Sequence, residues 1–116
     1  MKEDITFKEL QKFSYKIIDR YEKIEGRKWG AEGVMIETSK HLGELAKAVM
    51  VLEKYYFSDR KAIHSGYDLT KQSVVDELAD ILSMLFRLAK HYNLDLLKEY
   101  LRLKDEEDKL LTSKGV

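Results

Sequence analysis

Cysteine and proline are both absent from this chain of 116 residues. Without cysteine there are no disulfides, no thiolate nucleophiles and no cysteine-bound zinc, and the chain suits a reducing compartment. Long hydrophobic runs are also lacking, so nothing in the sequence has the pattern of a signal peptide or a membrane-spanning helix. From these absences we expect a soluble cytoplasmic protein that has no membrane partner.

Net charge is the third thing that the sequence lacks. Lysine and arginine number 21, and aspartate and glutamate also number 21, so the formal net charge is zero. Such a chain has no long-range field to attract nucleic acid or acidic lipid, and we expect no nucleic-acid polymer as a partner. Its length, with a mass of 13.6 kDa, predicts a single domain over residues 1–116.

Apolar residues recur at helical spacing along most of the chain, and no segment alternates as strands do. Thr6 and Glu9 form a capping-box pattern, and Thr70 and Asp95 are expected caps of later helices. Residues 58–69 lose the period and are expected to form a loop that holds a short helical piece. The predicted fold is all-α, a four-helix bundle with antiparallel neighbours. Its helices are expected from Thr6 to Gly26, from Val34 (after the breaker Gly33) to Tyr56, from Lys71 to Tyr92, and from Asp95 to about Thr112.

Asp80 is the residue that most needs an explanation. It lies in an otherwise apolar run, residues 78–86, and Glu77 precedes it by one helical turn. A helix that is apolar on nearly all sides is expected to be buried, and an unpaired carboxylate there is strongly unfavourable. Asp80 and Glu77 therefore require either a paired group or a bound cation.

Glu37, His41 and Glu44 line one stripe of the preceding helix, because they recur at i, i+4 and i+7. If this stripe faces Glu77 and Asp80, two carboxylates 4 Å apart repel by about 4 kcal/mol at an effective dielectric of about 20. Such a cluster either holds a proton or binds a cation, and carboxylate oxygens are ligands that Mg²⁺ prefers. The alternative is that the glutamates lie at helix surfaces and pair with lysines nearby, namely Lys40, Lys47 or Lys71.

Two segments on successive helices carry these acids, LGELAKAV at residues 42–49 and DELADIL at residues 76–82. The chain resembles, over about residues 27–110, the MazG-like family of all-α nucleoside triphosphate pyrophosphohydrolases, whose signature is Glu-x-x-Glu followed by Glu-x-x-Asp. The resemblance implies a four-helix MazG-type bundle completed by dimerisation, as a homodimer or a tetramer. It also implies hydrolysis of a nucleoside triphosphate between the α and β phosphates, which releases a nucleoside monophosphate and pyrophosphate.

Carried over residue by residue, Glu44, Glu77 and Asp80 match three of the four metal-binding acids of the family. His41 stands at the position of the fourth, and Glu37, one turn earlier, can partly replace it. The resemblance implies Mg²⁺, whereas an imidazole ligand favours Mn²⁺ or another transition ion. Glu44 is also the candidate catalytic residue that orients or deprotonates the attacking water.

Four further residues are candidates for contact with the nucleotide. Arg87 and His91 continue the acidic stripe of their helix, where a cation can meet the phosphate tail. Lys104 lies where the family often places a basic residue, and Trp29 can stack on a nucleobase. A solvated helix end is the alternative role for the cations, and core packing is the alternative for Trp29.

Other functions use similar residues. A di-iron bundle requires Glu-x-x-His pairs on two helices, and the sequence contains none. Phosphoribosyl-ATP pyrophosphohydrolase shares the fold and the acids of the MazG-like family, so it differs only in substrate. A non-catalytic helical module that binds a nucleotide or a protein, with one metal ligand lost at His41, is the alternative from a different class.

Overall fold

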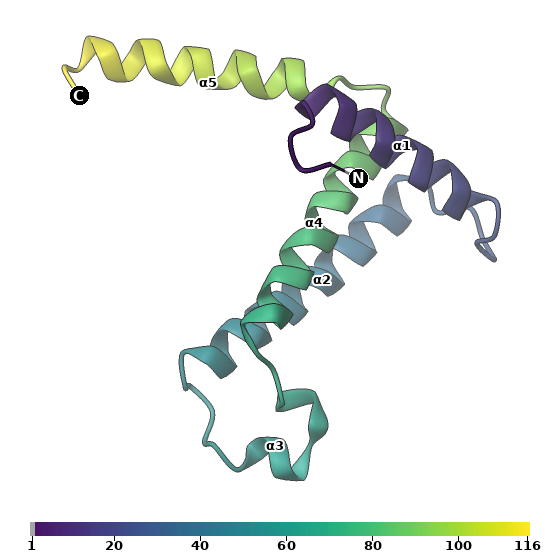
Figure 1. The fold of residues 1–116 in the computed structure, drawn as a ribbon, viewed down its shortest axis with the longest axis vertical. Coiled ribbons are helices and arrows are strands. Elements are labelled where there is room, and N and C mark those ends of the chain that lie inside the picture. Colours follow the sequence, from purple (N-terminus) through teal and green to yellow (C-terminus); the bar gives the residue numbers. More distant parts are fainter. Residues whose placement is uncertain (1) are drawn as a thin grey trace. The chain divides into compact units, whose positions relative to one another are not determined.

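The computed structural model describes residues 2–116, and every regular element in this part of the chain is a helix (Figure 1). The predicted all-α fold class is therefore confirmed. The elements are α1 (Phe7–Glu22), α2 (Gly30–Leu52), α3 (Arg60–Ile63), the 3-10 turn η1 (Ser65–Tyr67), α4 (Lys71–His91) and α5 (Leu96–Ser113). The four expected helices correspond to α1, α2, α4 and α5. Within residues 2–116, no helix is both long and apolar enough to cross a membrane.

Two of the expected caps explain where α1 and α5 begin. The Thr6 hydroxyl oxygen accepts a hydrogen bond from the Glu9 amide at 3.1 Å, and the Asp95 carboxylate accepts one from the Lys98 amide at 3.2 Å. Each bond satisfies an amide that the first turn of a helix leaves unpaired. Local sequence therefore determines both helix starts.

The start of α2 was predicted wrongly. The helix begins at Gly30, four residues before the expected start, so Gly33 lies inside its first turn. The Trp29 side chain packs against Gly33, and a Cβ added there would lie only 2.9 Å from the Trp29 Cβ. Gly33 therefore serves close packing, and it does not break the helix.

The end of α2 also differs from the prediction, because the helix stops at Leu52 and not at Tyr56. Lys54 follows with a left-handed φ of 61°, a conformation that cannot continue a helix. Residues 53–70 then contain α3 and η1, as the expected loop with a helical piece. At the start of α4 the Ser73 hydroxyl accepts a hydrogen bond from the Thr70 amide at 3.0 Å, which is the reverse of the contact expected of a Thr70 cap.

The described chain divides into two compact units. The central unit is Trp29–Leu85, which contains α2, α3, η1 and most of α4. The terminal unit comprises the chain up to Lys28 together with Phe86–Val116, and so contains α1, the end of α4 and α5. The single domain over residues 1–116 stays a prediction.

The core of the terminal unit forms around Phe86, which is only 1% exposed. Its ring lies 5.6 Å from that of Phe7 and 6.4 Å from that of Tyr15, and Ile18 and Ala89 are also buried. Tilted and edge-on contacts of this kind suit aromatic rings. They hold α1 against the last turns of α4.

Two ion pairs join the same two helices of the terminal unit. The Arg87 guanidinium pairs with the Glu25 carboxylate just beyond α1, and both side chains are largely buried. Lys90 pairs with Asp19 at 2.9 Å nearer the surface. Hydrogen bonding to Asp19 raises the pKa of Lys90, which keeps this amine charged.

In the central unit α2 and α4 lie side by side and run antiparallel, joined by residues 53–70 (Figure 1). Val34 and Ala48 are buried on α2, and His41 lies between them on the same side. α4 turns a half-buried stripe toward α2, made of Val74, Glu77, Ile81 and Met84.

α4 is not buried on nearly all sides, contrary to the expectation from its apolar run. Leu78, Leu82 and Leu85 are 52%, 41% and 47% exposed, and the Asp80 side chain is 53% exposed. The cause is that α2 covers only one side of α4 within the central unit. An apolar stripe shows that a face is suited to burial, and it does not show which element covers that face.

Candidate metal centre

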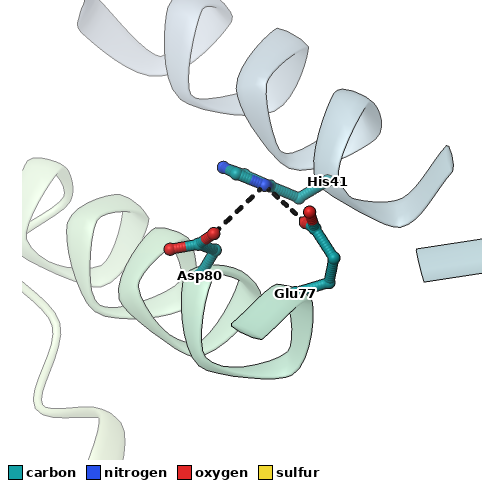
Figure 2. Close-up of side chains that lie close together, drawn as sticks. All are labelled: His41, Glu77 and Asp80. Carbon is teal, nitrogen blue, oxygen red and sulfur yellow. Dashed lines mark hydrogen bonds and ion pairs between the residues drawn. The ribbon is translucent and has the colours of Figure 1, made fainter. Parts of the chain in front are cut away.

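The acid cluster, defined as Glu37, Glu44, Glu77 and Asp80, surrounds the imidazole of His41. Glu37, His41 and Glu44 project from α2, and Glu77 and Asp80 project from α4. In Figure 2 the side chains of His41, Glu77 and Asp80 converge from the two helices. The two stripes identified from the sequence therefore face each other.

His41 contacts all four carboxylates through its two ring nitrogens. Nδ1 lies 2.8 Å from Glu77 Oε2, 3.6 Å from Asp80 Oδ2 and 3.8 Å from Glu44 Oε2. Nε2 lies 3.1 Å from Glu37 Oε1. The imidazole thus lies at the centre of the acid cluster, with three acids near one nitrogen and one near the other.

Burial differs across the cluster. The side chains of His41 and Glu77 are only 11% and 18% exposed, whereas those of Glu44 and Asp80 are 49% and 53% exposed. His41 and Glu77 therefore form the inner part of the site, and Glu44 and Asp80 form a rim that solvent and a ligand can reach.

The pKa values of two glutamates show how charge is distributed at the site. Hydrogen bonding with Glu77, followed by burial and charge repulsion from Glu77, raises the pKa of Glu44. Hydrogen bonding with Lys40, whose Nζ lies 2.6 Å from Glu37 Oε1, lowers the pKa of Glu37. Glu37 is therefore held as a carboxylate by its lysine, while Glu44 holds a proton more readily than an ordinary glutamate does.

The spacing of the donor atoms suits a divalent cation. In an octahedral shell with metal–ligand distances of about 2.1 Å, neighbouring ligands are about 3.0 Å apart and opposite ligands about 4.2 Å apart. The distances from His41 Nδ1 to the oxygens of Glu77, Asp80 and Glu44 are 2.8, 3.6 and 3.8 Å. The donor atoms of His41, Glu77 and Asp80 all lie within 4.8 Å of one another. Small side-chain adjustments are enough to place them around one ion.

The chemistry of the donors narrows the choice of ion. Carboxylate oxygens suit Mg²⁺ and Mn²⁺ alike, but an imidazole nitrogen favours Mn²⁺ and later transition ions over Mg²⁺. A neutral His41 offers Nδ1 to the cation while Nε2–H donates to Glu37, and such a partner fixes the orientation of a metal-binding histidine. The residues therefore fit Mn²⁺ at least as well as the Mg²⁺ expected from the sequence.

The candidate nucleotide contacts are divided between the two units. Trp29 belongs to the central unit, and Arg87, His91 and Lys104 belong to the terminal unit. Arg87 is in a buried ion pair with Glu25, Lys104 pairs with Glu107 at 2.9 Å, and the His91 ring lies edge-on to that of Tyr92. Their roles in substrate binding stay predictions, and the structure gives each of these three side chains a structural partner in its own unit.

Lys40 is a component of the site that the sequence analysis considered only as a general surface partner. Its amine pairs with Glu37, and hydrogen bonding to that carboxylate raises the pKa of Lys40. Charge attraction from Glu44 and Glu77 acts in the same direction. The i, i+3 spacing of Glu37 and Lys40 was the available signal for this pair.

Comparison of the chain with models of protein families, with curated proteins and with solved structures found no match. The function is therefore inferred from the geometry of the acid cluster and from the pattern of residues that forms it.

Proposed function

We propose that this protein is a metal-dependent nucleoside triphosphate pyrophosphohydrolase of the MazG-like type. Water would attack the α phosphorus, the bond to the oxygen that bridges the α and β phosphates would break, and a nucleoside monophosphate and pyrophosphate would leave. The observation that carries the proposal is the convergence of Glu44, Glu77 and Asp80 from two antiparallel helices on one point beside His41. On α4, Glu77 and Asp80 have the spacing Glu-x-x-Asp. On α2, Glu44 stands at the second position of the family's Glu-x-x-Glu, and His41 stands at the first.

Glu77, Asp80 and His41 are the residues proposed to hold the cation, and Glu44 would complete the set. When bound, a divalent ion would neutralise phosphate oxygens and so supply the charge compensation that phosphoryl transfer requires. Glu37 would orient His41 through Nε2 and would remain outside the set of ligands. The half-exposed rim of Glu44 and Asp80 leaves room for the triphosphate to approach.

Glu44 is the proposed general base. Its half-exposed carboxylate lies on the rim of the site, where water can reach it. Water bound beside Glu44 would thus lose its proton as it attacks the α phosphorus.

Hydrolysis of a nucleotide panel tests the proposal. The panel contains the common ribonucleoside and deoxyribonucleoside triphosphates and phosphoribosyl-ATP, each with Mg²⁺ and with Mn²⁺. Wild type is expected to be at least tenfold faster with Mn²⁺, because His41 contributes a nitrogen ligand. His41→Glu restores the fourth acid of the family signature. It is expected to shift the ratio of the rates with the two metals toward Mg²⁺ by at least tenfold. Chromatography of the nucleoside monophosphate, together with an assay for pyrophosphate, measures the rate of hydrolysis with each metal.

His64→Glu is the matched control, since it makes the same exchange at an exposed histidine outside the acid cluster. It is expected to leave the metal preference unchanged. If wild type and His41→Glu are both folded and inert on every nucleotide, the hydrolase proposal is wrong. That result would favour the non-catalytic helical module that binds a nucleotide or a protein and has lost one metal ligand at His41.

We also propose that the MazG-type fold is completed by a second copy of the chain. α4 carries the exposed stripe Val75, Leu78, Leu82 and Leu85, and α2 carries exposed Met35, Leu42 and Val49 at seven-residue intervals. Rows of this kind on neighbouring helices suit helix packing between two copies. Leu82 is chosen for the test because it lies in the middle of the α4 row.

Leu82→Glu is expected to convert a homodimer into a monomer, because a charge would be buried in the proposed interface. Light scattering after size-exclusion chromatography measures the mass, which should fall from near twice 13.6 kDa to near that value. Ser83→Glu adds the same charge at the next residue, outside the leucine row, and should leave the dimer intact. A wild type that is monomeric at millimolar concentration would contradict the proposal.

A further inference from the structure

A cavity of about 410 Å³ lies in the central unit, between the end of α2 and the segment that contains α3 and η1. Its volume is within the range of pockets that hold small ligands. None of the residues that line it belongs to the acid cluster. The charged and aromatic residues that line it are Lys54, Tyr56, Phe57, Arg60, Lys61, Tyr67 and Asp68.

Arg60 is fixed in this cavity by two tyrosines. Its guanidinium carbon lies 4.4 Å from the centre of the Tyr56 ring and 4.1 Å from that of Tyr67, and Nη2 donates to Tyr67 Oη at 2.7 Å. The rings themselves meet edge-on at 5.1 Å. Stacking orients a planar guanidinium without using most of its N–H donors, so they can still bind a ligand.

The charge around the cavity is strongly biased toward the positive sign. Lys54, Arg60 and Lys61 line it, and Lys47 lies against the Tyr67 ring at 4.2 Å. Asp68 is the one carboxylate of the lining. Within residues 2–116 none of these four cations forms an ion pair with a carboxylate, although the chain as a whole contains as many acids as bases. A compact anion would compensate this charge.

We propose that this cavity binds a phosphate-bearing small molecule with a planar ring, such as a nucleoside monophosphate, without the need for a metal. The phosphate would accept hydrogen bonds from the outward donors of Arg60 and from Lys61. The planar ring would pack against Tyr56 or Phe57, which also line the cavity. Asp68 would face the sugar, where its carboxylate can accept from a hydroxyl group.

The cavity is a second site and does not extend the acid cluster. Val51, which lines it, follows Glu44 by seven residues on α2, a rise of about 10 Å along the helix axis. The lining of the cavity is also basic, whereas the first site is an acid cluster. The inference does not rest on the proposed hydrolase activity, and it holds equally for a protein that only binds nucleotides.

Isothermal titration in the presence of a metal chelator tests the inference. The probes are adenosine 5′-monophosphate, adenosine and inorganic phosphate, each titrated into the full chain. The monophosphate is expected to bind at least tenfold more tightly than either fragment, because only it engages both the cations and the rings. Arg60→Gln and Lys61→Gln are each expected to weaken it by tenfold or more. Lys61 is exposed, so its replacement does not threaten folding.

Two controls separate this site from the metal centre and from general charge effects. Lys98→Gln makes the same change of charge on exposed α5 and should leave binding unchanged. Asp80→Asn should also leave it unchanged, even where it removes hydrolysis. No binding of the monophosphate by wild type at millimolar concentration would overturn the inference. So would equal affinity for inorganic phosphate, equal weakening by Lys98→Gln, or loss of binding in Asp80→Asn.

Discussion

Replacing Glu25 by alanine is expected to lower the free energy of unfolding by about 3–5 kcal/mol, because it removes the carboxylate that pairs with the buried Arg87 guanidinium. The Arg87 side chain is 7% exposed and that of Glu25 is 15% exposed, so water cannot easily solvate the guanidinium after the change. The pair also connects the end of α1 to α4 across 62 positions of sequence. Urea denaturation followed by circular dichroism at 222 nm measures the effect.

Glu99→Ala is the matched control, since it removes one partner of an exposed arginine pair on α5. The side chains of Glu99 and Arg102 are 49% and 58% exposed, and such a pair contributes about 0–1 kcal/mol. Combining Glu25→Ala with Arg87→Met should recover much of the lost stability, because the buried charged group is then replaced by an apolar side chain. A Glu25→Ala protein no less stable than Glu99→Ala would show that the pair is not needed.

This ion pair shows why one site residue could not be assigned from the sequence. Arg87 continues the acidic stripe of α4 in sequence, and that position suggested contact with a phosphate tail. Its actual partner, Glu25, lies beyond the end of α1, and no periodic pattern connects the two. Contacts of high sequence separation depend on how helices pack, which spacing within one helix does not determine.

Local signals predicted most of the helical structure. The caps at Thr6 and Asp95 fixed the starts of α1 and α5, because each bond forms within four residues. The start of α2 was missed because glycine is often a helix breaker. Only the contact of Gly33 with Trp29 shows that this glycine serves close packing inside the helix. The arrangement of residues 53–70 could likewise not be predicted from local sequence, because folding of a loop brings Arg60, Tyr56 and Tyr67 together.

The candidate site was predictable in its membership but not in its burial. Spacing alone placed Glu37, His41 and Glu44 on one stripe, and the structure brings that stripe against Glu77 and Asp80. Asp80 was expected to require a cation because apolar residues would enclose its carboxylate. In the single chain this carboxylate is half exposed, so that reason does not hold. The convergence of four acids on one imidazole replaces it, because their mutual repulsion exists at the surface as well as in the interior.

Asp80→Asn is expected to reduce nucleotide hydrolysis by at least 100-fold and to weaken Mn²⁺ binding by a similar factor. Loss of groups that only support a metal ligand already costs about 10–100-fold, and Asp80 is proposed as a ligand itself. The amide keeps the size of the side chain but removes the negative charge that attracts the cation. Steady-state hydrolysis and titration of Mn²⁺ followed by electron paramagnetic resonance measure the two effects separately.

Asp76→Asn is the matched control for this change. Asp76 lies one turn before Asp80 on α4 and is exposed. Its carboxylate accepts a hydrogen bond from the Gln72 amide at 2.9 Å, and Asp76 is not part of the acid cluster. The same exchange there should leave both measurements within about twofold of wild type, since Asp76 is not a proposed ligand and an exposed charge contributes little. Because Asp80 is half exposed, its replacement should leave the unfolding midpoint nearly unchanged, so a loss of activity would reflect the site and not the fold. If Asp80→Asn binds Mn²⁺ as tightly as Asp76→Asn, the cation is not held by these acids, and the proposed chemistry fails with it.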